Sequence, residues 1–437
     1  MALWRFMPNF VPMNILLIGS GGRESAIAWS LSQSPELGDL FIAPGNPGTL
    51  AYGNNVSVDW KQFVAMKDFC MNNRIDMVIV GPEEPLCQGL GDQFAADEDL
   101  ASILFIGPSA KGAQLEGSKD FAKSFMMRHN IPTASYTTFN ANELEAAVDY
   151  LATVNGPYVL KADGLAAGKG VVILDSLAEA QQEMRSMLGE AKFGAASSRV
   201  VVEAFLSGME FSVFAVTDGK SAVILPEAKD YKRIGEGDQG PNTGGMGAVS
   251  PVPLYDKAMQ KQVMSRIIEP TIEGLAKDGL PYKGFLFFGL IDVDGEAMVI
   301  EYNCRLGDPE TEVVLARLDE DFLPILRDAG NGELTNRVAQ QSTQSAATVM
   351  MVSEGYPGSY PRGLPIAGLD QASEHAIVFQ AGTALKDETL CTSGGRVLCV
   401  TGMGDDMATA LDKAYQAVAA ITFEGANHRK DIGQDIL

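Results

Sequence analysis

Short apolar runs that each end in a glycine- or proline-containing loop are the feature of this sequence that most constrains its fold. Residues 14–18 (NILLI) and 77–80 (MVIV) are such runs, and a helical stretch at 24–33 follows the first. Strands and helices that alternate in this way predict an open parallel sheet over residues 13–118. The loops after the strands lie at 19–22, 44–48, 81–85 and 107–109. Ordinary turn chemistry explains any one loop, but four together predict a ligand site, because ligands of such sheets bind at the carboxyl ends of the strands.

The loop GSGGRE at 19–24 invites comparison with a dinucleotide-binding fingerprint. That fingerprint requires glycine at the position of Glu24, and the run from Phe41 lacks the acidic residue that binds a ribose. The sequence therefore disfavours dinucleotide binding. It favours a phosphate of another ligand at the N-terminus of the following helix.

The chain of 437 residues is too long for one hydrophobic core, which predicts two to four domains. After residue 118 the pattern changes to hairpins separated by glycine loops, and the last section, from about 345, mixes short strands with one helix near 407–420. The prediction is a multidomain protein of α/β and α+β class. The predicted segments are an N-terminal extension at 1–12, an N-terminal α/β substrate-binding domain at 13–118, and further domains at 119–330 and 331–437.

Composition and charge exclude several classes of protein. The formal net charge of −23 argues against a nucleic-acid binder, which needs a basic face. Five cysteines without CxxC spacing and only three histidines argue against a disulfide framework or a zinc site. No apolar run reaches the roughly 18 residues of a spanning helix, and residues 1–12 lack the apolar core of a signal peptide. We expect a cytoplasmic protein without a membrane partner.

The first candidate for chemistry is the segment VLKADGLAAGKGV at 159–171. A strand ends near Lys161, a glycine-rich loop follows, and a second strand begins at Val171, which predicts a hairpin flap and not the strand–loop–helix of a Walker P-loop. Backbone N–H groups of such a loop can hold phosphates, and Lys161 adds a positive charge. A mobile surface hairpin with solvated lysines is the alternative.

A second candidate is the segment 200–210, in which an apolar strand ends in Glu203 and Glu210 follows seven residues later. A hinge of this kind can bind the edge of an adenine, and a carboxylate can bind a ribose hydroxyl. The pattern alone is weak, because such strand-to-turn patterns are common.

The run GFLFFGLIDVDGEAMVIEYN predicts a hairpin with a two-residue Asp-Gly turn at 294–295. An unbroken register from this turn places Glu301 opposite Phe288 and Asn303 opposite Leu286.

Glu301 and Asn303 are two residues apart and therefore share one face of the predicted strand. A carboxylate and an amide oxygen on one face suit Mg²⁺, which prefers hard oxygen ligands. A solvated strand face is the alternative, and the apolar surroundings argue against it. Asp292 lies too far along the hairpin, at roughly 13 Å for about 3.3 Å per residue, to join this pair.

Two further segments offer positive charge beside glycine-rich backbone. DYKR at 230–233 precedes GPNTGGMG at 240–247, and Lys232 and Arg233 can bind a phosphate or a carboxylate. Arg305, just beyond Asn303, can grip an oxyanion through two parallel hydrogen bonds. A flexible loop and a surface arginine are the alternatives.

Together these segments resemble the ATP-grasp superfamily and, within it, the family of phosphoribosylamine–glycine ligases. The resemblance extends over about 14–433 and rests on GSGGRE, APGNPGT, VGPEEPL, GPSAKGAQLEGSK, VLKADGLAAGKGV, DYKRIGEGDQGPNTGGMGA, EYNCRLGDPET, GGRVLCVT and RKDIG. It implies a central ATP-grasp domain with a glycine-rich flap and a small C-terminal mixed α/β domain.

The resemblance also implies a two-step ligation in purine biosynthesis. ATP phosphorylates the carboxylate of glycine, and the amine of 5-phosphoribosylamine then displaces phosphate to give glycinamide ribonucleotide, ADP and phosphate. Such phosphoryl transfer depends on positioning and charge neutralisation. The implied catalytic residues are Arg305 and Lys161, and the implied ligands of Mg²⁺ or Mn²⁺ are Glu301 and Asn303. The implied ATP contacts are Lys119, Lys161, Gly164, Gly168, Lys169, Gly170, Glu203, Phe205 and Glu210. The implied contacts to glycine and phosphoribosylamine are Gly21, Gly22, Arg23, Gly45, Asn46, Glu83, Lys232, Arg233, Asn242, Thr243, Gly244, Gly245, Arg305 and Asp308.

The sequence departs from the family pattern at Ser25, Tyr231 and Leu306, and Gly289 and Phe288 stand where many ATP-grasp enzymes have another metal-binding carboxylate. A related carboxylase that activates bicarbonate or formate is the nearest rival. A nicotinamide-dependent oxidoreductase and a catalytically silent nucleotide-binding module are more distant rivals. We expect a monofunctional, monomeric enzyme.

Overall fold

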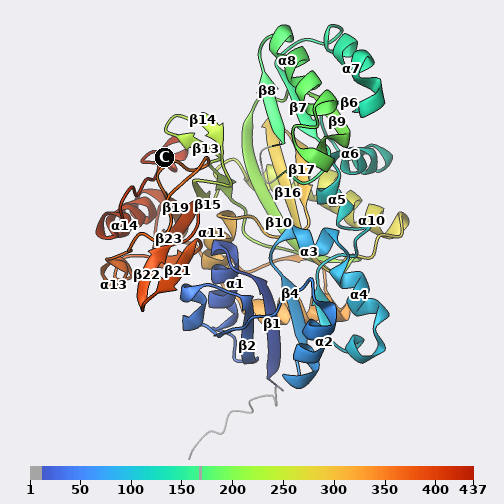
Figure 1. Cartoon of the computed structure of the whole chain (residues 1–437). Helices are drawn as coiled ribbons and strands as arrows, with labels where there is room; N and C mark the ends of the chain where they lie inside the picture. Colours follow the sequence, from blue (N-terminus) through green and yellow to red (C-terminus); the bar gives the residue numbers. More distant parts are fainter. Residues whose placement is uncertain (1–11, 167–169) are drawn as a thin grey trace, which may run out of the picture.

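The computed structural model describes residues 12–166 and 170–437, which build four principal β-sheets (Figure 1). The expectations for residues 1–11 of the N-terminal extension and for Gly168 and Lys169 of the flap lie outside these described residues.

The first sheet is open and entirely parallel, as the sequence predicts, with strand order β3-β2-β1-β4-β5. Its central strand β1 is buried because apolar residues 15–17 pack on both faces of the sheet. The strands are β1 (Met13–Gly19), β2 (Leu37–Pro44), β3 (Asn54–Asn55), β4 (Met77–Val80) and β5 (Leu104–Ile106). The helices are α1 (Gly22–Leu31), α2 (Phe63–Asn72), α3 (Glu83–Cys87) and α4 (Leu90–Ala96).

The second sheet is a four-stranded antiparallel layer with order β6-β9-β7-β8, at the top of Figure 1. It carries the predicted flap hairpin and has its own apolar core with two helices. Its strands are β6 (Tyr136–Asn140), β7 (Tyr158–Ala162), β8 (Val171–Leu174) and β9 (Arg199–Ala204). Its helices are α7 (Leu144–Leu151) and α8 (Leu177–Met184).

The third sheet, of order β17-β16-β10-β11-β18, carries the predicted metal-binding face. Its strands are β10 (Met209–Thr217), β11 (Ala222–Ile224), β16 (Gly284–Val293), β17 (Glu296–Asn303) and β18 (Arg337–Val338). The helices in this region of the chain are α5 (Gln114–Gly117), α6 (Lys119–Arg128), α9 (Lys257–Val263), α10 (Glu269–Lys277), α11 (Glu310–Arg317) and α12 (Phe322–Asn331).

The predicted register of the β16–β17 hairpin is wrong beyond the middle of the strands. The pairing shifts by one residue after Leu290↔Val299, so Glu301 faces Gly289 and Asn303 faces Phe287. Ile300 is the extra residue, and such a bulge re-aims the side chains that follow it. The bulge coincides with an added backbone pairing, because the Val299 N–H donates to the Pro132 carbonyl at 2.8 Å. Glu301 and Asn303 still lie two residues apart beyond the bulge.

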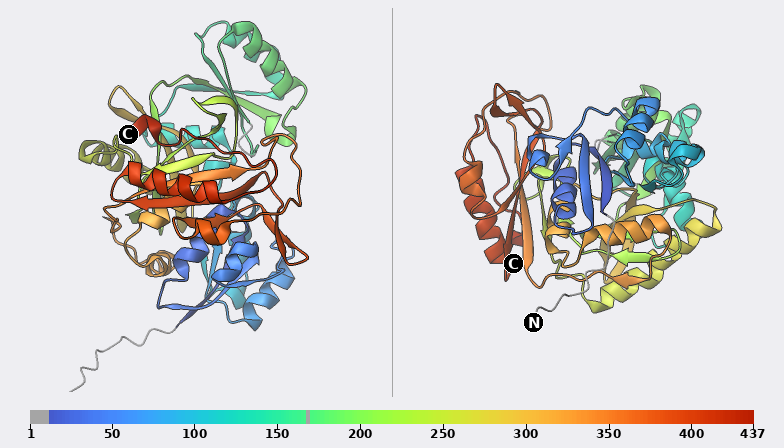
Figure 2. Two further views of the ribbon diagram at one scale, coloured as in Figure 1. Left: turned by 90° about the vertical axis from the view of Figure 1, so that its left-hand side faces the viewer. Right: turned by 90° about the horizontal axis from the view of Figure 1, so that it is seen from below.

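The fourth sheet joins strands from two distant parts of the chain, in the order β12-β15-β19-β23-β20. The long helix near the C-terminus packs along it (Figure 2, left). The strands are β12 (Lys229–Asp230), β15 (Gly247–Ser250), β19 (Ser345–Val352), β20 (Ile377–Gln380) and β23 (Arg396–Gly404), and the helices are α13 (Leu369–Ala372) and α14 (Met407–Ala420). Two small hairpins complete the fold, β13 (Arg233–Gly235) with β14 (Gln239–Asn242) and β21 (Thr383–Lys386) with β22 (Thr389–Thr392).

The N-terminal and C-terminal parts of the chain share one apolar core. Buried residues of α1, such as Ile27, cluster with residues of α11 and β23, such as Val313 and Cys399. The blue N-terminal sheet accordingly lies beside the red C-terminal elements when seen from below (Figure 2, right). Across the described residues, each helix is too short or too polar to cross a membrane.

Candidate active site

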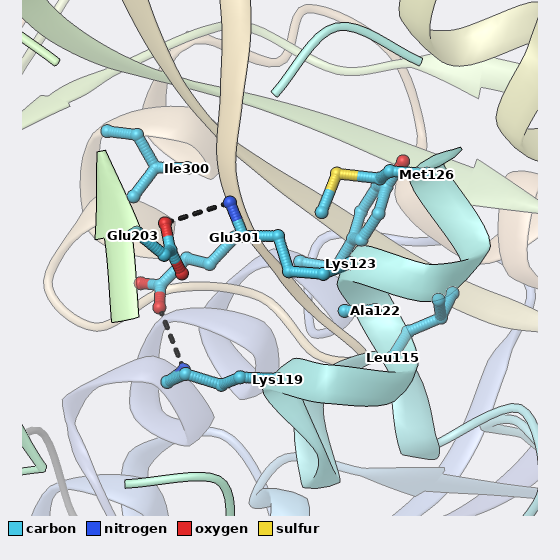
Figure 3. Close-up of a pocket in the computed structure, with 9 residues that line it drawn as sticks. Leu115, Lys119, Ala122, Lys123, Met126, Glu203, Ile300 and Glu301 are labelled. Carbon is cyan, nitrogen blue, oxygen red and sulfur yellow. Dashed lines mark hydrogen bonds and ion pairs between the residues drawn. The ribbon is translucent and has the colours of Figure 1, made fainter. Parts of the chain in front are cut away.

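A small pocket where α6 meets β9 and β17 brings together lysines and glutamates from three elements (Figure 3). Lys119 begins α6 directly after Ser118, whose hydroxyl accepts from the N–H of Phe121 and caps the helix. Lys119 Nζ lies 3.3 Å from Glu301 Oε2. Lys123 lies one turn further along the same face of α6 and points to Glu203. The pocket therefore unites Lys119, Glu203 and Glu301, three residues of the sequence prediction.

Glu203 is buried at the end of β9 between two lysines. Lys161 Nζ lies 2.9 Å from its Oε1, and Lys123 Nζ lies 2.8 Å from its Oε2. Burial acts to raise the pKa of Glu203, but the two ammonium groups outweigh it and the pKa is lowered. Burial lowers the pKa of Lys123 to about 8, against the attraction of Glu203. Lys123 was missed in the sequence prediction, because a lysine in an amphipathic helix usually has a solvated side chain.

Glu301, like Glu203, is held in its ionised form by lysines. Burial opposes its charge, yet Lys119, Lys232 and Lys161 lower its pKa to about 2. Asn303, two residues on, accepts from Arg305 Nη2 at 3.3 Å through its Oδ1. An ionised carboxylate and an amide oxygen are hard donors, so this pair fits Mg²⁺ chemically. Gly289 offers no carboxylate opposite Glu301, and a Cβ there would lie 3.2 Å from Glu301 Cγ.

Arg305 is held by two carboxylates from the first 120 residues of the chain. Its Nη2 lies 3.1 Å from Glu116 Oε1, and its Nε lies 3.8 Å from Glu83 Oε2. Glu116 also accepts from the Cys304 N–H at 2.8 Å, so it orients both the backbone and the side chain at the end of β17. Glu116 was missed in the sequence prediction, because no local pattern marks it.

Asp163 links the base of the flap to the start of α6. It follows β7 directly, accepts from the Asp120 N–H at 2.8 Å and from the Ser118 hydroxyl at 2.9 Å, and pairs with Arg199 at 2.6 Å. The strand that carries Lys161 and the helix that carries Lys119 are therefore held together by one buried carboxylate. Gly164, the next residue, packs on Ala196, to which a Cβ at 164 would come within 3.0 Å.

Lys232 approaches the pocket from the loop after β12. Its Nζ lies 2.7 Å from Glu210 Oε2 and 3.9 Å from Asp230 Oδ1. Thr243 donates its hydroxyl to the Lys232 carbonyl at 2.8 Å, which ties the GPNTGGMG loop to this lysine. Arg233 is directed elsewhere, since its Nη1 donates to the Gly240 carbonyl at 2.8 Å within the β13–β14 hairpin.

The N-terminal glycine loop and the loop after β17 meet beside the C-terminal sheet. The Arg23 N–H donates to Asp308 Oδ2 at 3.4 Å, and Arg23 Nη1 donates to the Leu306 carbonyl at 3.1 Å. Asp308 also pairs with Arg396 of β23 at 3.1 Å. Gly21 lies against Asp308, where a Cβ would come within 3.2 Å of Oδ2. This contact unites the predicted residues Gly21, Arg23 and Asp308.

A second carboxylate, Glu312, lies in the same contact and was also missed in the sequence prediction. It is fully buried on α11, and both its oxygens lack a hydrogen-bond partner among the described residues. One oxygen each of Asp308 and Glu312 and the sulfur of Cys399 lie within 4.8 Å of one another. Burial and the charge of Asp308 raise the pKa of Glu312 well above its usual value. Protons kept by the Glu312 carboxyl and the Cys399 thiol account for this cluster without a cation.

Several predicted residues serve the packing of these loops. A Cβ at Gly22 would lie 2.4 Å from Cys399 Sγ, and one at Gly245, whose φ is +118°, would lie 2.4 Å from Pro309 Cδ. The Gly244 N–H donates to the Tyr356 hydroxyl at 2.9 Å, and Asn242 pairs with Arg233 in the small hairpin.

Three other predicted residues are not among those that line the pocket of Lys119, Glu203 and Glu301. The Asn46 amide is occupied by the protein, since it donates to the carbonyls of Ser20 and Gln380 at 2.9 and 2.8 Å. Gly45 precedes it with φ +68°. Phe205 is 42% exposed just beyond β9.

The residues that depart from the family pattern make local contacts. Ser25 donates to the Gln380 carbonyl at 2.6 Å, and Tyr231 donates to Asp435 at 2.6 Å. Leu306 is buried in the core shared by the N-terminal and C-terminal parts.

Comparison with known proteins gives matches over nearly the whole chain. The N domain, the ATP-grasp (A) domain and the C domain of phosphoribosylglycinamide synthetase match residues 13–116, 117–311 and 346–435. The phosphoribosylamine–glycine ligase of Agrobacterium fabrum is 48% identical over 96% of this chain and 98% of its own length. That of Escherichia coli O6:H1 is 45% identical over 96% and 98%. The crystal structure of phosphoribosylamine–glycine ligase from Thermotoga maritima superposes with a TM-score of 0.83 at 34% identity, covering 96% of this chain and 100% of that one.

Proposed function

The chain belongs to the phosphoribosylglycinamide synthetase family and is a ligase of the ATP-grasp type, and on this premise we propose that it joins glycine to 5-phosphoribosylamine in purine biosynthesis. The reaction consumes ATP and yields glycinamide ribonucleotide, ADP and phosphate. One observation carries the proposal at the level of the site: Glu301 pairs with Lys119 at 3.3 Å, and the charges of Lys232 and Lys161, from two other segments, also act to lower its pKa. Such a site binds anions and a cation together, which is what phosphoryl transfer from ATP requires.

ATP lies, in this proposal, between the flap sheet and the third sheet. Lys161 and Lys119 neutralise its phosphates, Gly164 and Gly170 of the flap lie close to them, and Glu210 binds the ribose. The support is the convergence of Lys161 on Glu203 and of Lys119 on Glu301 at one pocket. Neither lysine needs to act as a base, because a phosphoryl group is transferred by positioning and by neutralisation of charge.

Glu301 and Asn303 hold Mg²⁺ in this proposal, and the same oxygen donors accept Mn²⁺. The metal supplies neutralisation of the phosphate oxygens and a fixed orientation for them. The chain itself keeps Glu301 ionised and aims both side chains from one face of β17, beyond the bulge at Ile300.

The carboxylate of glycine is bound by Arg305, which Glu116 and Glu83 hold in place. ATP phosphorylates this carboxylate to glycyl phosphate, and the amine of phosphoribosylamine then displaces phosphate. Lys232, Arg233 and the loop at 242–245 bind the anionic parts of the substrates. The N-terminal glycine loop at 21–23 and Asp308 close the other side of the site, together with Gly45, Asn46 and Glu83.

The same proposal includes a division into domains near residues 118 and 330, a monomeric enzyme and a cytoplasmic location. The domain models that match residues 13–116, 117–311 and 346–435 support the division, and the cysteine composition supports the location.

The decisive experiment measures ADP release from ATP and Mg²⁺ with glycine and freshly prepared phosphoribosylamine, added separately and together. We expect release only when both are present. Release that ignores glycine and depends on bicarbonate or formate would assign the chain to a carboxylase with the same fold. As a control, Glu273→Gln alters an exposed carboxylate that pairs with Lys277 on the surface, and the rate should not change.

A further inference from the structure

Lys123 is a buried lysine for which the proposed reaction has no direct role. Its side chain is only 2% exposed. Its Nζ lies 2.8 Å from Glu203 Oε2 and donates to the Thr133 hydroxyl at 2.7 Å. An ammonium group this deeply buried is costly unless its charge is paired, so the fold maintains it at the expense of stability.

The charges around Glu203 do not balance one to one. Two lysines, Lys161 and Lys123, share a single carboxylate. The two differ in what surrounds them: Lys161 lies on β7 at the base of the flap, whereas Lys123 is held in the pocket by Thr133. Among the described residues, Lys161 pairs with Glu203 alone, whereas Lys123 pairs with Glu203 and also donates to the Thr133 hydroxyl. The Lys161 contact is therefore the less constrained of the two charge pairings.

Nucleotide binding would change the pairing of Lys161 with Glu203. In the proposed function Lys161 neutralises a phosphate of ATP, and a phosphate competes with Glu203 for the same ammonium group. If Lys161 were the only partner, its departure would leave an ionised carboxylate buried without a counter-charge, which is strongly unfavourable. Lys123 avoids this penalty, because it stays paired with Glu203 when Lys161 turns to the phosphate.

We propose that Lys123 is a positioning residue for ATP binding: it is the permanent counter-charge of Glu203 that allows Lys161 to transfer from Glu203 to a phosphate of the nucleotide. This inference rests on the proposed function, since it takes Lys161 as a phosphate ligand. It assigns different roles to two lysines that bind one carboxylate.

The surroundings of Lys123 connect this exchange to the metal-binding strand. Thr133, which accepts from Lys123, donates its own hydroxyl to the Val299 carbonyl at 2.7 Å. On the turn side of the bulge, Val299 is the last residue of β17 that keeps the original pairing with β16. The bulge that follows it sets the direction of Glu301. Lys123 is also four residues from Lys119, which pairs with Glu301. Through Lys123 and Lys119, one face of α6 thus holds Glu203 and Glu301 at a fixed separation.

The test measures the dissociation constant of ATP with Mg²⁺, without glycine or phosphoribosylamine, for the full-length chain. We expect Lys123→Met to weaken ATP binding by at least tenfold and Lys123→Arg to restore most of the loss. Lys161→Met should weaken binding as well. The double variant Lys123→Met/Glu203→Gln should bind ATP more tightly than the sum of the two single effects predicts, because the unpaired charge has gone.

Two further variants keep the test decisive. Lys277→Met removes a lysine from an exposed ion pair of comparable type and should leave ATP binding unchanged. If Lys123→Met does not fold, Thr133→Val removes the neutral partner of Lys123 while keeping both charges, and a two- to threefold weakening is expected. A folded Lys123→Met variant that binds ATP as the wild type does, or additive effects in the double variant, would overturn the inference. A wild-type chain that fails to bind ATP would instead overturn the proposed function.

Discussion

Glu203 and Glu312 are both buried carboxylates, but their surroundings shift their pKa values in opposite directions. Glu203, in the lysine–glutamate pocket, has two lysines within 2.9 Å and a lowered pKa. Glu312, between the N-terminal loop and the C-terminal sheet, has Asp308 and Cys399 close by and a strongly raised pKa, which the charge of Arg396 opposes only weakly. Burial is similar in the two places, so the difference lies in the partners.

The comparison teaches which carboxylates act through their charge. An acid that is held ionised by lysines loses its role when it becomes an amide, whereas an acid that is already neutral is mimicked by one. Replacement of glutamate by glutamine therefore separates the two regions.

Glu301→Gln should reduce the rate of ADP formation by about a thousandfold or more, because it removes the ionised carboxylate that we propose as a metal ligand. Steady-state assays with saturating glycine and phosphoribosylamine would measure this. The melting temperature should change little by comparison. A rate within tenfold of the wild type would mean that Glu301 does not hold the metal.

Arg305→Lys should reduce kcat/KM for glycine by about a hundredfold, because lysine cannot reproduce a planar bidentate grip on a carboxylate. The KM for ATP should stay within about threefold, since the role proposed for Arg305 is to bind glycine and not the nucleotide. Equal losses for both substrates would show that Arg305 acts on the fold of the site instead.

Gly22→Ala should destabilise the contact between the N-terminal loop and the C-terminal sheet by about 1–3 kcal/mol, as overpacking of a dense core does. The new methyl group would lie 2.4 Å from Cys399 Sγ and 2.5 Å from Glu312 Oε1. Denaturant titration would measure the loss, and Cys399→Ala in the same chain should recover part of it. A Gly22→Ala variant as stable as the wild type would contradict this packing.

Glu312→Gln should leave activity within about threefold of the wild type and raise the melting temperature by a few degrees at alkaline pH. The pKa of Glu312 is raised in the folded chain, so the folded state keeps a proton that the unfolded state loses above about 4.5. The contribution of Glu312 to the free energy of unfolding is therefore complete below that pH and falls as the pH rises toward the pKa of the folded state. Glutamine does not titrate, so the variant should not show this fall.

A melting curve measured from pH 6 to pH 9 for both chains checks this prediction. The difference in melting temperature between the variant and the wild type should widen as the pH rises. A constant gap, or one equivalent of bound transition metal that is lost in Glu312→Gln, would show that a cation and not a proton neutralises the cluster.

Much of the architecture was predictable from local patterns. The parallel sheet, the flap hairpin from Tyr158 to Leu174 and the helix Met407–Ala420 all follow from runs of apolar residues and the glycine loops between them. The Asp294-Gly295 turn was also confirmed, since Val293 pairs with Glu296. These features depend on neighbouring residues alone, which is why they could be predicted.

The errors and omissions share another cause. The register of Glu301 was wrong because the bulge at Ile300 coincides with a backbone pairing to Pro132, far away in the sequence. Lys123 and Glu116 were missed because the ion pair that brings each of them into the site is made with a residue at least 80 positions away in the sequence. The roles predicted for the individual site residues stay predictions until the variants above are measured.

By itself, the sequence determined the types of the elements, the glycine loops at their ends and the pairing of a carboxylate with an amide two residues later on one strand. Only the tertiary structure decided which carboxylates carry charge. The reason is electrostatic: burial disfavours the ionised form of every acid, and only the arrangement of distant side chains decides whether an ammonium group, as at Glu203, or another acid, as at Glu312, lies next to it.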